Sequence, residues 1–215
     1  LTVVGGAVMS WKHRGHLLTP RPPGSPVLAA ALMIAAAWLL VGWVQFNETP
    51  LTGDERDIWA ARADIAFETG GFGQEYKEAL HPRRALVYHP DYPALNPLLQ
   101  LWMSVTNGAG AGAQARWPIQ LFDLCALLYL AGVLRRTLRP WATALLTVGT
   151  FLTTWYLLPT CGADRMVTLG VLMAADGAIC ALTGLKGGRA PLCLGLLLMA
   201  ASKHEGTALA IVLLI

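Results

Sequence analysis

Two short charged motifs in this sequence have the residue types of a catalytic site. The first is GDERDIW at 53–59, where Asp54 and Glu55 stand side by side shortly after a long apolar segment. A carboxylate can take the proton from a hydroxyl group, which makes both residues candidate general bases. The pair also opens a predicted helix, where acidic residues offset the positive end of the helix dipole. Catalysis and capping therefore both remain open. A divalent cation could join such carboxylates, although two adjacent residues do not make a metal site.

The second motif is SKHEG at 202–206. Lys203, His204 and Glu205 interrupt an apolar stretch that runs from 191 to 215. Charged residues inside an apolar stretch are costly, so they are usually functional or paired with one another. A lysine and a histidine here could hold a phosphate group. A simple Lys203–Glu205 ion pair at the end of a helix is the alternative.

Two further segments are predicted to lie near these motifs. In HPDYP at 89–93, two prolines stiffen the chain and fix the directions of the side chains between them. The segment is either a rigid turn or an edge that faces a substrate. Asp164 and Arg165 open a later apolar segment and are predicted to reach the same surface. The candidate substrate-binding residues are thus His89, Asp91, Tyr92, Asp164, Arg165, Lys203, His204 and Glu205.

The elements that carry these residues are predicted to be membrane helices. Of the 215 residues, 55% are hydrophobic and only 13% are charged, whereas soluble domains carry about 25% charged residues. The net charge is only +3 and the basic residues form no stripe, so nucleic-acid binding is not expected. We expect an all-α, polytopic membrane helix bundle. Its predicted spans are about 27–46, 117–134, 140–158, 164–183, 190–202 and an incomplete one over 206–215.

The distribution of charge predicts the orientation of the bundle. The tail (1–26) and the connectors after the second and fourth spans carry eight basic residues and no acidic one. Basic connectors mark the cytoplasmic side. The outer loop (47–116) then faces outward, and its first part (47–93) holds nine of the thirteen carboxylates. Asp123 and Asp176 lie deeper in apolar segments and are interpreted as structural hydrogen-bond partners.

Two short helices are predicted within the outer loop. Thr52 and Glu55 form a capping-box pattern that starts a helix from 54 to about 69. Ile58, Trp59, Ile65 and Ala66 lie on one side of it and are predicted to rest on the membrane surface. A second helix is predicted over 97–106, with Asn96 as N-cap and Asn107-Gly108 as its end. Its ten residues cover about 15 Å, too little to cross a bilayer.

Taken in order, these motifs resemble the GT-C superfamily of membrane glycosyltransferases, especially the bacterial relatives of protein mannosyltransferase and of the aminoarabinose transferase. The resemblance rests on GDERDIW, HPDYPALNPLLQLWM, CGADRMVTL and SKHEG, and on their matching topology. It covers about 27–215 and corresponds to the N-terminal half of such an enzyme. The chain begins without Met and ends within an apolar run, so we expect a piece of a longer protein.

The resemblance implies transfer of a sugar from a polyprenyl-phosphate donor to a lipid, glycan or protein acceptor. The reaction would take place at the outer face of a bacterial inner membrane, as a single inverting displacement. Asp54 would be the catalytic base, with Glu55 as neighbour or substitute. Lys203, His204 and Arg165 would stabilise the departing phosphate. Two alternatives stay open: a secondary transporter of a small solute, which would place paired charges near midplane, and an inactive truncated membrane protein.

Overall fold

Helices make up all the regular structure in the described part of the computed structural model. That part covers residues 25–48, 50–51, 53–83, 87, 89–154, 162–185 and 187–214, and it contains no strand. The predicted all-α fold class is therefore confirmed for these residues. Most of the predicted tail (1–26), and Thr52 of the predicted capping box, lie outside the described residues.

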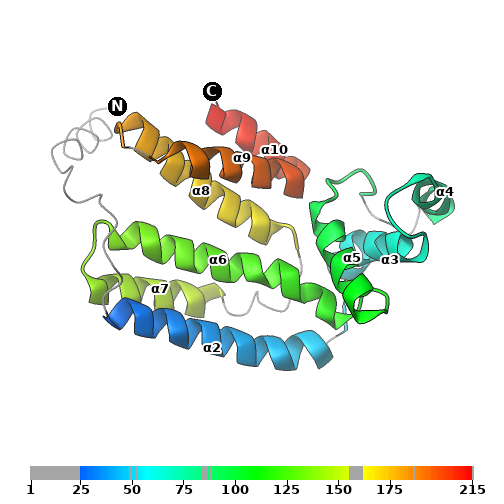
Figure 1. Ribbon diagram of the computed structural model, residues 1–215, viewed down its shortest axis with the longest axis horizontal. Helices are drawn as coiled ribbons and strands as arrows, with labels where there is room; N and C mark the ends of the chain where they lie inside the picture. Colours follow the sequence, from blue (N-terminus) through cyan, green and yellow to red (C-terminus); the bar gives the residue numbers. More distant parts are fainter. Residues whose placement is uncertain are drawn as a thin grey trace.

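Six longer helices form a bundle. They are α2 (Ser25–Glu48), α6 (Arg116–Arg135), α7 (Pro140–Thr154), α8 (Asp164–Leu182), α9 (Arg189–Ser202) and α10 (His204–Leu214). Helix α6 lies in the middle, with α2 and α7 packed together on one side of it and α8 on the other (Figure 1). Helix α9 packs against α8, and α10 against α9.

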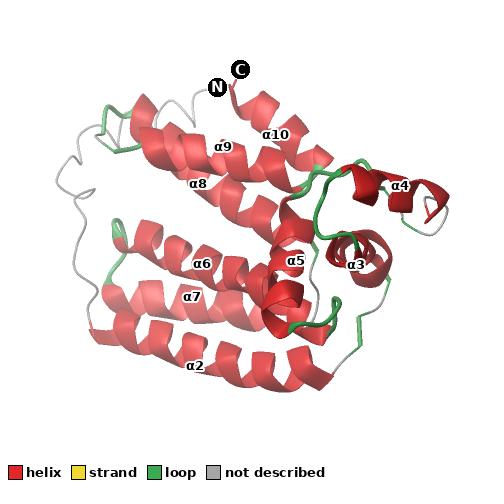
Figure 2. Cartoon of the chain, turned by 45° about the vertical axis from the view of Figure 1, so that its right-hand side comes forward, coloured by secondary structure: helices red, strands yellow, loops and turns green. Residues whose placement is uncertain are grey.

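Shorter elements gather at one end of this bundle, which we call the cap. They are the π-helical turn η2 (Glu55–Ala60), α3 (Ala61–Glu68), α4 (Gln74–Arg83), α5 (Leu95–Asn107) and the 3₁₀ turn η3 (Ala113–Ala115). Helix α3 packs against α4 and α5, and α5 packs against η3 and against α6 of the bundle (Figure 2). The starts of α6, α8 and α10 all point toward the cap.

The cap and the bundle share one apolar core. Ile58 and Trp59 of η2 pack against Ile119 of α6 and Met166 of α8. Elsewhere Trp38 of α2, Leu127 of α6 and Phe151 of α7 form a second cluster, and Ala174, Met199 and Ala210 form a third between α8, α9 and α10. The position of η2 is therefore set by the same contacts that hold α6 and α8.

The segments predicted as spans are observed as helices. Helices α2, α6, α8, α9 and α10 begin and end within two or three residues of the predicted bounds, and the described part of α7 ends at Thr154. Among the described residues, Ala113–Arg135 and Asp164–Leu182 are long and apolar enough to cross a bilayer by length and composition. Pro26–Leu40, Arg189–Ser202 and His204–Leu213 are shorter apolar helices.

The predictions for the cap are correct in part. The helix expected from 54 to about 69 is present as η2 followed by α3. Gly108 ends α5 in a left-handed conformation, with φ of 66°, as the Asn-Gly pair predicted. Asn96 as N-cap was wrong: α5 begins at Leu95, and Asn96 is fully buried inside the helix, where its Oδ1 accepts a hydrogen bond from Gln100.

The predicted membrane-facing side of the first cap helix was also wrong. Ile58 and Trp59 are buried in the core shared with α6 and α8, and Ile65 and Ala66 pack against α4. The reason is that α6 and α8 cover η2, while α4, a helix absent from the sequence interpretation, covers α3. The apolar side of η2 and α3 is thus satisfied by protein contacts.

Candidate functional site

Four segments that are far apart in the sequence meet where the cap joins the bundle. They are η2, the turn at 89–93, the start of α8 and the α9–α10 junction. Side-chain contacts link the turn to the junction and the junction to α8, while an aromatic contact links the turn to η2. The two charged motifs of the sequence are therefore linked through Tyr92, which contacts Trp59 of the first motif and His204 and Glu205 of the second, and we call this region the junction site.

Tyr92 lies at the centre of the junction site. Its ring stacks on Trp59 of η2, with ring centroids 5.5 Å apart, and on His89, at 4.6 Å. The ring of His204 meets it edge-on at 5.1 Å. The Tyr92 hydroxyl donates a hydrogen bond to Glu205 Oε1 at 3.3 Å. Burial and the charge of Glu205 raise the pKa of Tyr92, so it stays a neutral donor at physiological pH.

The turn that presents Tyr92 is fixed from both sides. His89 has a φ of 51°, a left-handed conformation that non-glycine residues seldom adopt. The Tyr92 N–H donates to the His89 carbonyl at 3.1 Å and closes the turn. The Tyr92 carbonyl accepts a hydrogen bond of 2.7 Å from Nη1 of Arg62, a buried residue of α3. The prolines of 89–93 thus stiffen a turn that α3 also holds.

Lys203 occupies the gap between α9 and α10. Its backbone is extended, with φ of −160° and ψ of 153°, and separates the two helices. The ammonium group donates to Asp164 Oδ1 at 3.1 Å and lies 3.9 Å from Glu205 Oε1. Partial burial lowers the pKa of Lys203, but the hydrogen bond and charge of Asp164, with the charge of Glu205, raise it by more. The predicted Lys203–Glu205 pair is present, and Asp164 is the closer partner.

His204 extends the junction site toward solvent. Its Nε2 lies 3.4 Å from Asp91 Oδ2, and both side chains are exposed. The pKa of Asp91 is lowered by a hydrogen bond from the Asp91 backbone N–H to its carboxylate, and His204 lowers it further. Asp91, Asp164 and Glu205 thus present three carboxylates around one lysine and one histidine.

The two adjacent carboxylates of GDERDIW have opposite surroundings. Asp54 is exposed at the start of η2 and makes no side-chain capping bond. Glu55 is buried and accepts hydrogen bonds of 2.6 and 3.0 Å from Arg116, whose guanidinium also donates to the Pro50 carbonyl. Of the pair, Asp54 is therefore the one placed to meet a ligand, and Glu55 ties η2 to the start of α6.

Arg165 is turned away from the junction site. Its side chain is 8% exposed and forms an ion pair with Asp123 of α6 inside the bundle. The neighbouring Asp164 side chain is 76% exposed and faces Lys203. Arg165 therefore lies inside the bundle, within electrostatic reach of Glu55 of η2, and apart from the exposed carboxylates around Lys203. Asp123 is a structural partner, as the sequence predicted.

Three residues of this region were missed by sequence reasoning. Trp59 and Arg62 lie one and two turns after Glu55 on the buried side of η2 and α3, and Arg116 opens α6. A signal was present for Arg116, since it is a cation at the start of a long apolar segment. Arg62 has the charged neighbours Asp57 and Asp64 in the sequence and gave none. A buried cation needs an acceptor, and these acceptors are the Tyr92 carbonyl for Arg62 and Glu55 for Arg116.

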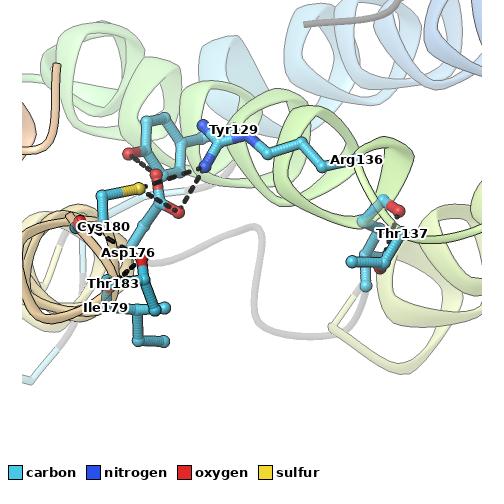
Figure 3. A network of polar contacts seen from close by, with 8 residues as sticks. Tyr129, Arg136, Thr137, Asp176, Ile179, Cys180 and Thr183 are labelled. Atoms are coloured by element: carbon cyan, nitrogen blue, oxygen red, sulfur yellow. Dashed lines mark hydrogen bonds and ion pairs between the residues drawn. The ribbon is translucent and has the colours of Figure 1, made fainter. Parts of the chain in front are cut away.

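A second polar cluster lies at the other end of α6. Figure 3 shows Tyr129 and Arg136 pointing toward Asp176 of α8. The Tyr129 hydroxyl donates to Asp176 Oδ2 at 2.7 Å, and Arg136 Nη1 donates to Asp176 Oδ1 at 2.6 Å. The predicted structural role of Asp176 is confirmed, because these bonds join α6 to α8.

No three His, Cys, Asp or Glu side chains in the described residues are grouped so that they could share a metal ion. The carboxylates of the junction site instead face Lys203, His204 and Tyr92. What this arrangement offers chemically is a surface of exposed carboxylates around one lysine and one histidine, beside a stack of aromatic rings that includes Trp59 of η2. Asp54 is exposed at the start of the same element. No protein-family model, curated protein or solved structure matches this chain.

Proposed function

We propose that this chain belongs to a membrane glycosyltransferase that moves a sugar from a polyprenyl-phosphate donor to an acceptor hydroxyl at the junction site. The observation that carries the proposal is the meeting of GDERDIW, HPDYP, the start of α8 and SKHEG at one end of the bundle. These are the four motifs on which the resemblance to the GT-C superfamily rests. A polar, carboxylate-lined surface at one end of an apolar bundle suits a donor with a charged head and an apolar tail.

The outward-facing side chains of the bundle support a membrane location. Large apolar residues are exposed on each of its helices, and such extensive apolar surface is rare on soluble monomers. Examples with more than half of their surface exposed are Leu32, Leu40, Trp43, Trp141, Leu145, Leu152, Leu182, Leu197 and Val212. Lipid contact would satisfy these side chains.

Asp54 is proposed as the base. The acceptor oxygen attacks the anomeric carbon, its proton passes to Asp54, and the carbon–oxygen bond to the phosphate breaks with its electron pair on the phosphate. The configuration at the anomeric carbon is inverted. Lys203 and His204 stabilise the departing phosphate after exchanging their carboxylate partners for it. The exposed ring of His89, which stacks on Tyr92, offers a flat face for a sugar ring.

The test is sugar transfer in membranes that contain the expressed protein, with radiolabelled polyprenyl-phosphate sugars as donors. Asp54→Asn should lower turnover at least about 100-fold, the usual contribution of a general base. Asp57→Asn is the matched control, because Asp57 lies on the same turn and pairs with the exposed Arg56. It should leave turnover within about twofold, since exposed ion pairs contribute little.

Lys203→Ala should weaken donor binding in the same assay, seen as a higher KM for the donor. Equal turnover in wild type and Asp54→Asn would contradict the proposed base. Absence of transfer with every donor, together with solute uptake driven by a proton or sodium gradient, would favour a transporter. The ion pairs Asp123–Arg165 and Asp176–Arg136, which join α6 to α8, would then be the candidate charges for transport.

A further inference from the structure

We infer that the groove between α2 and α6 binds one anionic phospholipid, whose phosphate is held by Arg135. The inference rests on the membrane location within the proposed function, but not on the transfer reaction. The groove lies at the end of α6 opposite to the junction site. Helix α6 has 20 residues, which places its ends about 30 Å apart.

The groove is a cavity of about 510 Å³ with apolar walls and a basic end. Val27, Leu28 and Ala31 of α2 form one wall, and Leu128 and Gly132 belong to the facing wall on α6. Leu28 and Leu128 are 50% and 43% exposed, so both walls reach the outer surface of the bundle. Arg135 and Arg136 line the same cavity. This combination suits an acyl chain attached to a negatively charged headgroup.

The two arginines differ in what already binds them. Arg136 donates to Asp176 at 2.6 Å and lies beside Tyr129, so its charge is balanced within the protein (Figure 3). Arg135 donates from Nη1 to the Leu138 carbonyl at 3.1 Å. Its buried Nε has no hydrogen-bond partner in the described part of the chain. A buried N–H without a partner is costly, and turning the side chain toward the groove would let a phosphate oxygen satisfy it.

The charge near Arg135 also favours an anion. Arg139 follows in the same connector and is exposed, and the nearest acidic side chain of the cluster, Asp176, is paired with Arg136. Arginine matches the two free oxygens of a phosphodiester, because its N–H groups form a planar fork. Basic residues beside membrane helices attract anionic lipids of the cytoplasmic leaflet, and the predicted topology puts this connector on that side.

The shape of the groove determines whether an acyl chain can enter it. A lipid tail gains little by leaving the bilayer for an apolar groove, because both surroundings are apolar. The affinity therefore comes mainly from the headgroup, and the groove admits a tail only while its volume is open. Gly132 keeps it open: a side chain at this position would meet no atom within 4 Å. A larger residue there would fill the groove without straining the helix.

The experiment is native mass spectrometry of the purified full chain in detergent. It is titrated with phosphatidylglycerol or with phosphatidylcholine that carries the same acyl chains. Wild type should bind phosphatidylglycerol more tightly, and Arg135→Gln should lower that affinity about tenfold, the loss expected for hydrogen bonds to a charged group. Arg139→Gln, which removes the same charge from a residue outside the groove, should change it less than about threefold.

A second pair of variants tests the groove itself. Gly132→Leu should abolish the phosphatidylglycerol adduct, whereas Gly149→Leu on α7 should keep it. Gly149 is the matched control, because a side chain there also meets nothing within 4 Å and the position does not line the groove. Melting temperatures equal to wild type would show that each variant is folded.

Three results would overturn the inference. They are equal binding of the two lipids, an unchanged Arg135→Gln variant, and an adduct with the mass of a second chain in place of lipid. A further result would overturn the groove as the lipid site. Lipid binding would be lost in Arg135→Gln but not in Gly132→Leu, and inorganic phosphate would displace the lipid, which would mean that the site binds a free phosphate. Lipid binding without any sugar transfer would refute the proposed reaction alone. Recovery of the chain from cells without detergent would refute the membrane location under both.

Discussion

Glu55 and Arg116 form the most enclosed ion pair in the described structure. Their side chains are 8% and 1% exposed, and two hydrogen bonds join them. Removing one partner of a buried ion pair strongly destabilises the fold, because the other charge then lacks its opposite charge in a poorly polarisable surrounding. The pair connects η2 to the start of α6, and η2 carries Asp54. Its role is therefore to hold the candidate base in position.

We expect Glu55→Ala to lower the free energy of unfolding by about 3 to 5 kcal/mol, and Arg116→Ala to do the same. The double variant should lose clearly less than the sum, because neither charge is then left alone. Denaturant titration of the purified chain in detergent would measure these changes. Glu68→Ala is the control, since its pair with Arg83 is exposed, and it should cost less than about 1 kcal/mol. Additive losses would contradict a coupled pair.

Asp64 makes the stability of the fold depend on pH. Partial burial raises its pKa, although the Ala111 N–H donates a hydrogen bond that acts in the opposite direction. A carboxyl whose pKa is higher in the folded state stabilises the fold fully below its unfolded pKa of about 4. This contribution is lost as pH rises through the folded value. At pH 7 the charged Asp64 is therefore destabilising.

Asp64→Asn should raise the melting temperature at pH 7, because the amide is neutral and its oxygen still accepts from Ala111. The gain over wild type should shrink as the pH falls toward 4, where Asp64 becomes protonated. Thermal unfolding at several pH values would measure both curves. Glu75→Gln, an exposed position of α4, controls for the loss of one negative charge. An increase that persists undiminished at pH 4 would exclude this explanation.

At the scale of elements, α8 and α9 are held together by close backbone contact. A Cβ added to Gly195 of α9 would lie 2.5 Å from the Gly170 carbonyl oxygen and 2.5 Å from the Ala174 nitrogen of α8. A Cβ on Gly177 would lie 2.4 Å from the Leu192 nitrogen. Small residues that let helices approach are typical of helix pairs in membranes. The α9–α10 junction, with Lys203, depends on this pairing for its position.

We predict that Gly195→Ala destabilises the chain by about 1 to 3 kcal/mol, because backbone atoms that cannot move aside meet the added methyl group. Gly149→Ala, in open space on α7, should be neutral or stabilising by up to about 1 kcal/mol, since alanine is the better helix former. Unfolding in detergent would compare the two. Equal effects would show that α8 and α9 are not as close as described.

The positions of most helices along the chain could be predicted from the sequence, because long apolar runs bounded by charge or proline have few other structures. Helix α4 could not, since QEYKEALHPR is polar and contains Pro82. Its formation depends on Tyr76 and Leu80 packing against Ile65 and Ala66. The start of α5 was misplaced because Asn96 is a strong capping residue locally, while its burial beside Gln100 is decided by tertiary contacts.

For the junction site, the sequence predicted which motifs would meet but not which side chains would face each other. The order of helices and connectors puts 54–55, 89–93, 164–165 and 203–205 at one end. The turning of Arg165 inward to Asp123, and of Glu55 inward to Arg116, follows from the rotation of α8 and η2 about their axes. That rotation depends on packing, which spacing along the chain does not determine.

At the scale of the whole molecule, the cap end of the bundle carries most of the carboxylates together with basic residues such as Arg62, Arg116 and Lys203, whereas the far end of α6 is mainly basic. Arg135, Arg136 and Arg139 lie at that far end. If the bundle spans a membrane, this difference determines its orientation, because basic connectors stay in the cytoplasm. The junction site then faces outward, as the proposed reaction requires.

Reporter fusions at the two ends of α6 test this orientation. Alkaline phosphatase fused after Gly110, on the cap side, should be active, because it folds only outside the cytoplasm, and green fluorescent protein there should be dark. Fusions after Leu138 should show the reverse. The two sites flank α6, which is long and apolar enough to cross a bilayer. Inverted signals would put the junction site in the cytoplasm and exclude an outward-facing reaction. Identical signals at the two sites would mean that α6 does not cross, and the apolar surface of the bundle would then need to be covered by another protein chain.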